Sequence, residues 1–351
     1  MSATDADANS PLGLGPATST ALGPVQGVAI DSSSGEVYIA NPQSDVIEAI
    51  GPSGTLAVVA GRLGQAGPAI PGVATRSDLD TPDGVAVDSS GNLYIADTDN
   101  DVIEKVTPSG NLSIIAGMQG QRGFPIPGPA TSSDLYGPHA VAVDGSGNLY
   151  IADTDNDVIE KVTPSGTLSI IAGTGQAGTP IQGPATGSAF NNPEGLAVSS
   201  SGNVYVSDTG NSAVEEITQA GQLSIVAGKP FEPAPIGGNV LSDLSNPEGV
   251  AIDGSGDLYI AGTYNAAVEE LAASGTMSIV AGNGQPDAPT PGTATDSSVL
   301  GPEGLAVSSS GNLYIADTGN DTVEEVTPAG QLSIIGGVPG QSPTSTQAAV
   351  R

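Results

Sequence analysis

Six polar residues recur at regular spacing, each just ahead of a similar short apolar run. Four carry carboxylates, one is the only histidine and one is an amide: Gln26, Asp83, His139, Glu194, Glu248 and Glu303. They are 54 to 57 residues apart. If the fold gathers them, their oxygen atoms suit a hard cation such as Ca²⁺ or Mg²⁺. An imidazole beside a carboxylate suits proton transfer. The spacing indicates that six equivalent units position these side chains.

Each unit contains four runs typical of β-strands. In the second unit they span residues 84–88, 92–97, 101–106 and 111–117, and the connecting turns are rich in Gly, Ser, Asp, Asn and Pro. The first run, "GVAV", is continuously apolar, as expected for a strand buried on both faces. Short strands with a 55-residue period predict an all-β, six-bladed β-propeller with four antiparallel strands per blade. A β-solenoid, the competing repeat fold, usually has a shorter period.

Matched positions within the units carry the side chains expected to pack between blades. The middle residue of the first run is always alanine, which suits the crowded region near the axis. The second run always carries tyrosine, and we expect these rings to pack between blades: Tyr38, Tyr94, Tyr150, Tyr205, Tyr259 and Tyr314.

The units resemble NHL repeats, a family of six-bladed propellers. The resemblance is carried by "PEGLAVSSSGNVYVSDTGNSAVEEI" and by Pro82–Gly117, and it covers essentially the whole chain. It implies the propeller fold. It does not imply one function, because the family includes scaffolds, sensor ectodomains and enzymes. The basic residues that some relatives place after the turn asparagine are missing here.

The repeats define the expected domain boundaries. We predict an N-terminal tail or half connector over 1–21, a propeller over 22–337 and a C-terminal tail over 338–351. The repeats lie near 22–61, 79–117, 135–173, 190–228, 244–282 and 300–337. The two tails together look like one inter-blade connector cut open, so we expect each blade to be one continuous repeat, with no strand exchanged to seal the ring.

Two further polar sets recur in the turns. An Asp follows the first strand, at Asp31, Asp88, Asp144 and Asp253, and Ser199 and Ser308 replace it elsewhere. Both residue types accept backbone N–H bonds in turns, so we expect a structural role. A "DTDN" or "DTGN" turn follows the second strand at 97–100, 153–156, 208–211 and 317–320. Asx turns explain it, and the twelve-residue calcium loop ending in glutamate is absent.

Composition excludes several classes of protein. The chain has 351 residues, no cysteine and a net charge of -31, from 38 acidic and seven basic residues. Such a field repels nucleic acid and anionic membranes, and no apolar run is long enough to span a bilayer. Without cysteine there are no disulfides or thiolate metal sites. The N-terminus looks like that of a mature, exported protein, so we expect an extracellular or cell-surface location and a monomer.

In a propeller the first strands surround the axis and begin on one face. The six polar residues of the opening set are therefore expected to form a ring at one mouth of the central channel. Asp83, Glu194, Glu248 and Glu303 are the candidate ligands of a cation such as Ca²⁺. A solvated mouth that merely tolerates polar residues is the simpler alternative. A single histidine excludes a multi-histidine zinc site, and no "GxSxG" motif accompanies it.

The leading interpretation is a non-enzymatic acidic propeller that binds a protein, a carbohydrate or another small molecule. No catalytic residue is assigned. The alternative is a divalent-cation-dependent hydrolase or lyase, similar to lactonases, that uses the acidic ring. Calcium binding that depends on Glu194 and Glu248 would favour the ring as a site.

Overall fold

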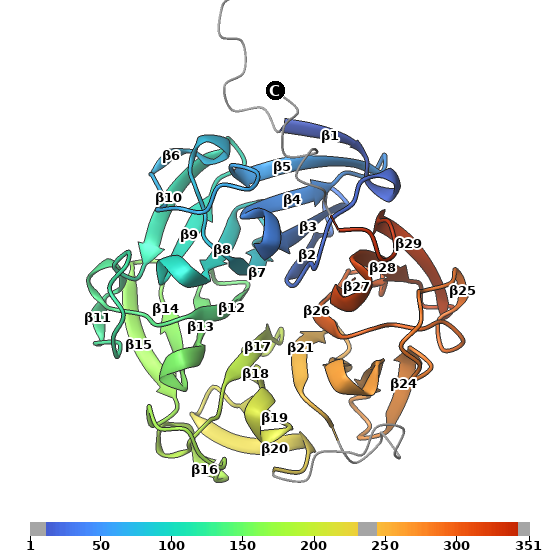
Figure 1. Cartoon of the computed structure of the whole chain (residues 1–351). Coiled ribbons are helices and arrows are strands. Elements are labelled where there is room, and N and C mark those ends of the chain that lie inside the picture. Colours follow the sequence, from blue (N-terminus) through green and yellow to red (C-terminus); the bar gives the residue numbers. More distant parts are fainter. Residues whose placement is uncertain (1–11, 231–243, 343–351) are drawn as a thin grey trace, which may run out of the picture.

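A computed structural model of the chain describes residues 12–230 and 244–342, which form six antiparallel β-sheets around a central axis (Figure 1). The six-bladed propeller predicted from the sequence is confirmed. Within the described residues there is no α-helix, and ten 3-10 turns complete the regular structure.

The blades follow one another in sequence. Blade 1 contains β1 (Leu12–Pro16), β2 (Val28–Asp31), β3 (Glu36–Asn41), β4 (Val46–Ile50) and β5 (Thr55–Gly61). Blade 2 contains β6 (Gly72–Val73), β7 (Pro82–Val87), β8 (Leu93–Asp97), β9 (Val102–Val106) and β10 (Asn111–Ala116). Blade 3 contains β11 (Gly128–Pro129), β12 (Pro138–Val143), β13 (Leu149–Asp153), β14 (Val158–Val162) and β15 (Thr167–Ala172).

Blades 4 to 6 repeat this order. Blade 4 contains β16 (Gly183–Pro184), β17 (Pro193–Val198), β18 (Val204–Asp208), β19 (Ala213–Ile217) and β20 (Gln222–Gly228). Blade 5 contains β21 (Pro247–Ile252), β22 (Leu258–Gly262), β23 (Ala267–Leu271) and β24 (Met277–Ala281). Blade 6 contains β25 (Gly292–Thr293), β26 (Pro302–Val307), β27 (Leu313–Asp317), β28 (Thr322–Val326) and β29 (Gln331–Gly337).

Counted over the described residues, five of the six sheets have five strands, where the sequence predicted four. The extra strand comes from the connector that precedes each blade and pairs with its outermost strand, as Gly128 does with Leu168. The open edge of the outer strand offers unpaired N–H and C=O groups, and two residues of connector are enough to use them. Glycine suits this place because Gly72, Gly128 and its counterparts have positive φ, 141° and 148° for these two.

β1 lies within the segment 1–21 that the sequence analysis assigns to a tail, and it is the outermost strand of blade 1. Every sheet consists of strands that are consecutive in the chain, so the described strands show no exchange between the ends. The outer parts of the two tails, residues 1–11 and 343–351, lie outside the described residues.

In every blade a short 3-10 turn joins the two middle strands of the four predicted from the sequence, as between β3 and β4 in blade 1. These turns are η2 (Pro42–Ser44), η4 (Thr98–Asn100), η6 (Thr154–Asn156), η8 (Thr209–Asn211), η9 (Thr263–Asn265) and η10 (Thr318–Asn320). The residue after each turn is left-handed, with φ of 57° at Asp101, a conformation that Asp and Asn tolerate better than most residues. Four further 3-10 turns lie in the connectors: η1 (Ala17–Ser19), η3 (Ala74–Arg76), η5 (Ala130–Ser132) and η7 (Ala185–Gly187).

The hydrophobic core lies between neighbouring blades. Each apolar cluster draws on two adjacent sheets, and the matched tyrosines lie within or against these clusters. Tyr314 and Ala316 of blade 6 pack with Leu22 and Ile39 of blade 1. The ring is therefore closed by side-chain packing, and Figure 1 shows the first and last blades side by side.

At five of the six blade interfaces, a threonine in the 3-10 turn forms a hydrogen bond to the next blade. Its hydroxyl donates to the backbone oxygen of the residue that precedes the polar ring position in the next blade. Thr98 donates to Pro138 O at 2.8 Å, and Thr318 donates to Val25 O at 2.6 Å across the junction of blades 6 and 1. Pro42 replaces this threonine in blade 1, so that interface lacks the bond.

Candidate functional site: a polar ring at the channel mouth

The residue after each ring position determines how closely the innermost strands approach. A Cβ added to Gly27, Gly84, Gly195, Gly249 or Gly304 would clash with the backbone oxygen of the ring residue in the next blade. Glycine lets the innermost strands pack backbone against backbone, which keeps the channel narrow at this level. Blade 3 carries Ala140 here and accommodates one methyl group.

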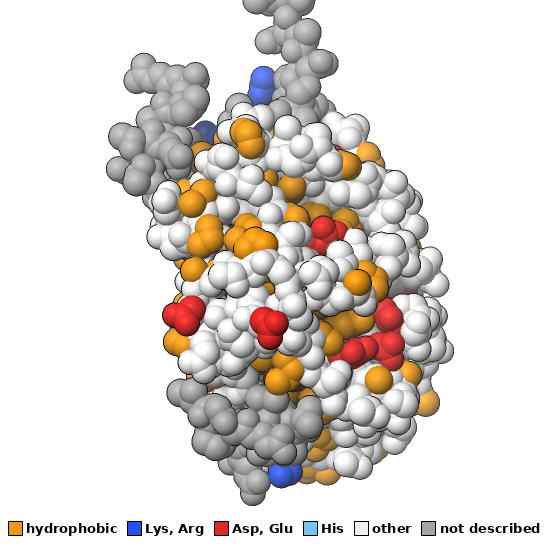
Figure 2. All heavy atoms as spheres, turned by 90° about the vertical axis from the view of Figure 1, so that its right-hand side faces the viewer, with side chains coloured by type: hydrophobic (Ala, Val, Ile, Leu, Met, Phe, Trp, Pro, Cys, Tyr) orange, Lys and Arg blue, Asp and Glu red, His pale blue; other side chains and the backbone are white. Residues whose placement is uncertain are grey.

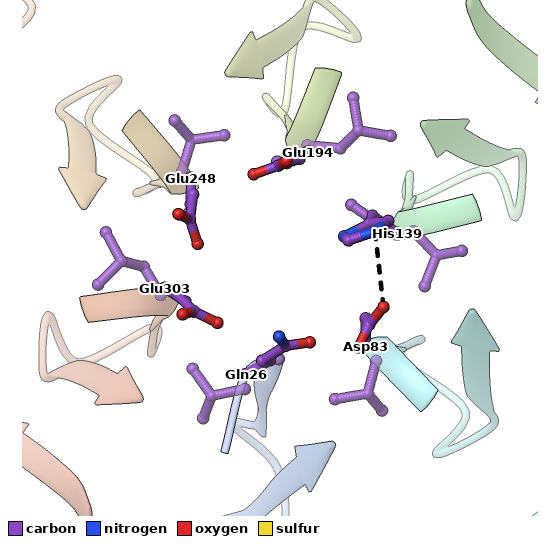
Figure 3. A pocket seen from close by; sticks show the side chains of 18 residues that line it. Gln26, Asp83, His139, Glu194, Glu248 and Glu303 are labelled. Carbon is purple, nitrogen blue, oxygen red and sulfur yellow. Dashed lines mark ion pairs between the residues drawn. The ribbon is translucent and has the colours of Figure 1, made fainter. Parts of the chain in front are cut away.

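The six predicted ring residues do lie together. They line one cavity of about 300 Å³ on the axis. Figure 3 shows their side chains arranged around the open centre, each from the start of a different innermost strand. The one ion pair among them joins His139 Nε2 and Asp83 Oδ2, 3.7 Å apart, if the imidazole is protonated. The prediction that these six side chains lie at the channel mouth rests on the repeat alone.

Burial makes the ring carboxyls weak acids. The pKa of Glu248 is raised to about 8 by loss of water and by the charges of Glu303 and Glu194. Burial and neighbouring acids likewise raise the pKa of Glu303 to about 7. Burial also raises the pKa values of Asp83 and Glu194, although His139 opposes both shifts. The ring therefore retains protons near neutral pH, because its carboxylates repel one another in a poorly solvated space.

The ring does not assemble a metal centre. Among the described residues, no three Asp, Glu or His side chains come close enough together to hold an ion. The four carboxyl groups lie around the axis on four different blades and do not meet at one point. Calcium chelation by Asp83, Glu194, Glu248 and Glu303 therefore does not fit this arrangement.

An apolar collar follows the ring at the next level along the central channel. Six aliphatic residues, two positions after the ring residues, line the acidic cavity and also a second cavity of about 200 Å³: Val28, Val85, Val141, Leu196, Val250 and Leu305. The second cavity has no charged lining residue, and alanine, valine and isoleucine complete it. The channel is thus acidic at one mouth and aliphatic beyond it.

The structure also buries a second set of acids, which is not among the site residues predicted from the sequence. One strand in each blade has a buried glutamate at its middle position, and these strands are β4, β9, β14, β19, β23 and β28. The side chains are at most 2 % exposed: Glu48, Glu104, Glu160, Glu215, Glu269 and Glu324. A charged residue at the same place in all six copies of a short apolar run was the available signal.

In blade 2 this glutamate meets the first aspartate of the "DTDN" turn. Asp97 accepts bonds from Asp80 N and Asn100 Nδ2, both at 2.7 Å. Neither oxygen of Glu104 has a donor, but its carboxyl group hydrogen-bonds that of Asp97. Burial and the charge of Asp97 raise the pKa of Glu104 well above its usual range. Glu104 must therefore keep its proton and donate it to the Asp97 carboxylate.

Other blades also place a hydrogen-bonding partner beside the buried glutamate. Asp153 and Glu160 repeat the pair in blade 3. In blade 1 the aspartate is replaced by Asn41, whose Nδ2 donates to Glu48 Oε2 at 3.0 Å. The chain thus supplies a proton here either as a carboxylic acid or as an amide. The remaining turn aspartates are structural as predicted, since Asp88 accepts from Ser90 N, Asn92 N and Tyr94 Oη at 2.9 to 3.0 Å.

The fold and the ring together define an acidic six-bladed β-propeller with a polar channel mouth. The NHL repeat model matches three segments, residues 79–100, 190–215 and 300–323, which are parts of blades 2, 4 and 6. The chain thus contains NHL repeats and folds as a six-bladed propeller.

Two relatives show where similar sequences occur. The chain is 28% identical to mouse (Mus musculus) teneurin-3 over 279 residues, which is 68% of this chain and 10% of teneurin-3. It is 24% identical to NHL repeat-containing protein 2 of cattle (Bos taurus) over 288 residues, 72% of this chain and 40% of that protein. The chain thus spans about a tenth of the length of the teneurin it matches.

Three solved structures share the fold at low identity. Virginiamycin B lyase of Staphylococcus aureus gives a TM-score of 0.54 at 15% identity, covering 96% of this chain and 90% of that one. A gluconolactonase of Xanthomonas campestris gives 0.57 at 15%, covering 94% and 96%. An auxiliary nutrient binding protein of Bacteroides ovatus gives 0.59 at 14%, covering 90% and 70%.

Proposed function

We propose that this protein is a non-enzymatic binding module that takes a ligand at the ring of its central channel. The observation that carries the proposal is the cavity of about 300 Å³, to which six blades each contribute one polar side chain. Such a volume is at the lower end of the range for small-molecule sites and also admits one protruding side chain of a protein partner. The nutrient binding protein of Bacteroides ovatus is an example of a binding role on this fold.

Charge selects the class of ligand. The net charge of -31 attracts cations and repels nucleic acids. On the side of the molecule shown in Figure 2, acidic side chains form patches among apolar and uncharged ones. Among the described residues, no helix is long and apolar enough to cross a bilayer. A location outside the cell and a monomeric state stay predictions.

A thermal-melt screen against small cations, neutral sugars, anions and basic peptides tests this function. Ligands that stabilise the protein should lose their effect in the variant Glu248→Gln/Glu303→Gln. They should keep it in Glu325→Gln, whose carboxylate accepts bonds from Asn312 and Tyr314 and does not line the cavity. Mass spectrometry should recover each ligand unchanged. Stabilisation that ignores the ring variant, or no stabilisation by any class, would overturn the proposal.

A second candidate function rests on the pair formed by His139 and Asp83. A lone imidazole beside a carboxylate can move a proton, and the virginiamycin B lyase and the gluconolactonase share this fold. Lactone hydrolysis or ring-opening elimination that is lost in His139→Gln would establish this alternative. The expected route through a chelated calcium ion lacks support, because no three acidic or histidine side chains among the described residues converge on one point.

A further inference from the structure

The channel has two chemically distinct layers in direct succession. The outer layer is the ring of four carboxyls, one imidazole and one amide, and the inner layer is the collar of four valines and two leucines. The collar residues line both cavities, so a ligand that passes the ring meets hydrocarbon on every side. A matching ligand therefore needs a polar head and an apolar stem in line.

The ring contains a hydrogen-bond acceptor with nothing to accept. Asp83 is 7 % exposed and its Oδ1 has no hydrogen-bond partner among the described protein atoms. The Oε1 atom of Gln26, also in the ring, is likewise buried and without a partner. Unsatisfied buried oxygens are costly. These two oxygens leave unused acceptor capacity at the cavity that a ligand's donor groups can satisfy.

We propose that the channel binds a primary ammonium group on an unbranched alkyl stem, with the ammonium at the ring and the stem in the collar. This ligand class deepens the function proposed above and rests on it. An ammonium carries three donors and one positive charge, which suits acceptors arranged around an axis better than a metal ion that needs converging ligands. The ring contains no phenylalanine, tyrosine or tryptophan, so a quaternary ammonium would find no cage of such rings, and it has no N–H group to donate to the ring oxygens.

Two sources share this chemistry, a free alkylamine and a lysine side chain of a partner protein, and the order of the two layers favours the first. A free alkylamine, represented by hexylammonium, can place its stem in the collar behind the ammonium. A lysine that enters at the ring, represented by Nα-acetyl-lysine N-methylamide, leads with its ammonium and leaves its stem outside the collar. Binding of hexylammonium well above that of the lysine analogue supports the proposal, and equal binding of the two would contradict the placement of the stem.

Calorimetric titration at pH 7.5 tests the two layers separately. From butyl- to hexylammonium, affinity should rise about fourfold per methylene as the stem enters the collar. Hexyltrimethylammonium and 1-hexanol should each bind about tenfold or more weakly than hexylammonium, since they lack N–H donors or charge. Equal affinity across the alkyl series, or for the trimethylated analogue, would overturn the proposal.

Matched variants locate the binding. Glu248→Gln/Glu303→Gln should abolish hexylammonium binding, while Glu325→Gln should leave it unchanged. Val250→Thr, a near-isosteric change in the collar, should reduce the gain per methylene and retain methylammonium binding. Melting curves establish that each variant is folded. Binding that survives the ring variant would place the amine elsewhere and refute the assignment.

Proton release gives a readout that does not depend on affinity. Glu248, with a pKa raised to about 8, and Glu303, raised to about 7, hold protons that an incoming cation displaces. Titrations in phosphate and in HEPES, neither of which contains a primary amine, should differ in apparent enthalpy by an amount that indicates proton release. No release, or uptake, contradicts binding at these carboxyls. If other ligands act through the ring but alkylammonium does not, only the ligand class fails and the binding function stands.

Discussion

The buried carboxyl pair of blade 2 predicts how stability changes with pH. Glu104 is fully buried, and burial together with the Asp97 charge raises its pKa well above the ordinary value of 4.5. The folded protein therefore holds a proton that the unfolded chain releases. A group with a raised folded pKa stabilises the fold below its unfolded pKa, and this contribution is lost as pH rises toward the folded pKa. Stability should thus fall on going from pH 5 to 8.

The substitution Glu104→Gln removes this proton linkage while keeping the shape and a donor toward Asp97. Each proton taken up on folding changes the free energy of unfolding by about 1.4 kcal/mol per pH unit. The free energy of unfolding of Glu104→Gln should therefore rise relative to the parent between pH 5.5 and 7.5, by an amount that approaches about 3 kcal/mol when Glu104 holds its proton over the whole interval. At pH 5.5 the two proteins should be similar, since Gln donates where the protonated Glu did.

Urea unfolding followed by circular dichroism measures this difference at each pH. Glu48→Gln is the matched control, because Asn41 already donates to Glu48 and the pKa of Glu48 is raised only to about 7. The advantage of Glu48→Gln should level off above pH 7, whereas that of Glu104→Gln should continue to grow. Repeating both at 0.5 M salt removes long-range charge effects. Parallel pH curves for Glu104→Gln and the parent would refute the shared proton.

Three further predictions concern the ring and its closure. Thr318→Val removes the bond to Val25 across the junction of blades 6 and 1, and should lower the free energy of unfolding by about 1 kcal/mol in urea titrations; an unchanged midpoint would show that this bond contributes nothing. Gly249→Ala should destabilise by about 1 to 3 kcal/mol because its Cβ would meet Glu303 O, whereas Ala140→Gly should cost less than about 1 kcal/mol, and equal losses would contradict the close approach of the strands. Addition of chelator should leave the melting temperature unchanged, since the ring carboxylates do not converge, and a large downward shift would reveal a metal site.

Much of the architecture could be read from the repeat. The 54 to 57-residue spacing, the four apolar runs and the Gly, Asn and Asp turns specify a blade because strand periodicity and turn conformation are local properties of the chain. The ring also followed, since residues at matched positions of a closed repeat must lie at matched places around its axis. The fifth strands could not be predicted, because two residues such as Gly128 and Pro129 are too short a segment to show strand periodicity. They become a strand only by pairing with the free edge of β15.

The set of equivalent units, and the order of polar and apolar residues along each of them, follow from the sequence alone. Whether those residues are protonated, and whether they can chelate a metal ion, depends on the tertiary structure. The repeat places a glutamate at the position of Glu104 in every copy, but the sequence does not show that it keeps its proton, which follows from the burial of β9 between β8 and β10 and from the neighbouring Asp97. Likewise, the ring acids face one another across the axis without meeting at one point, and this separation depends on how closely the six innermost strands pack, five of them through a glycine. Protonation and chelation depend on distances and on excluded water, and both arise only when segments far apart in the chain meet.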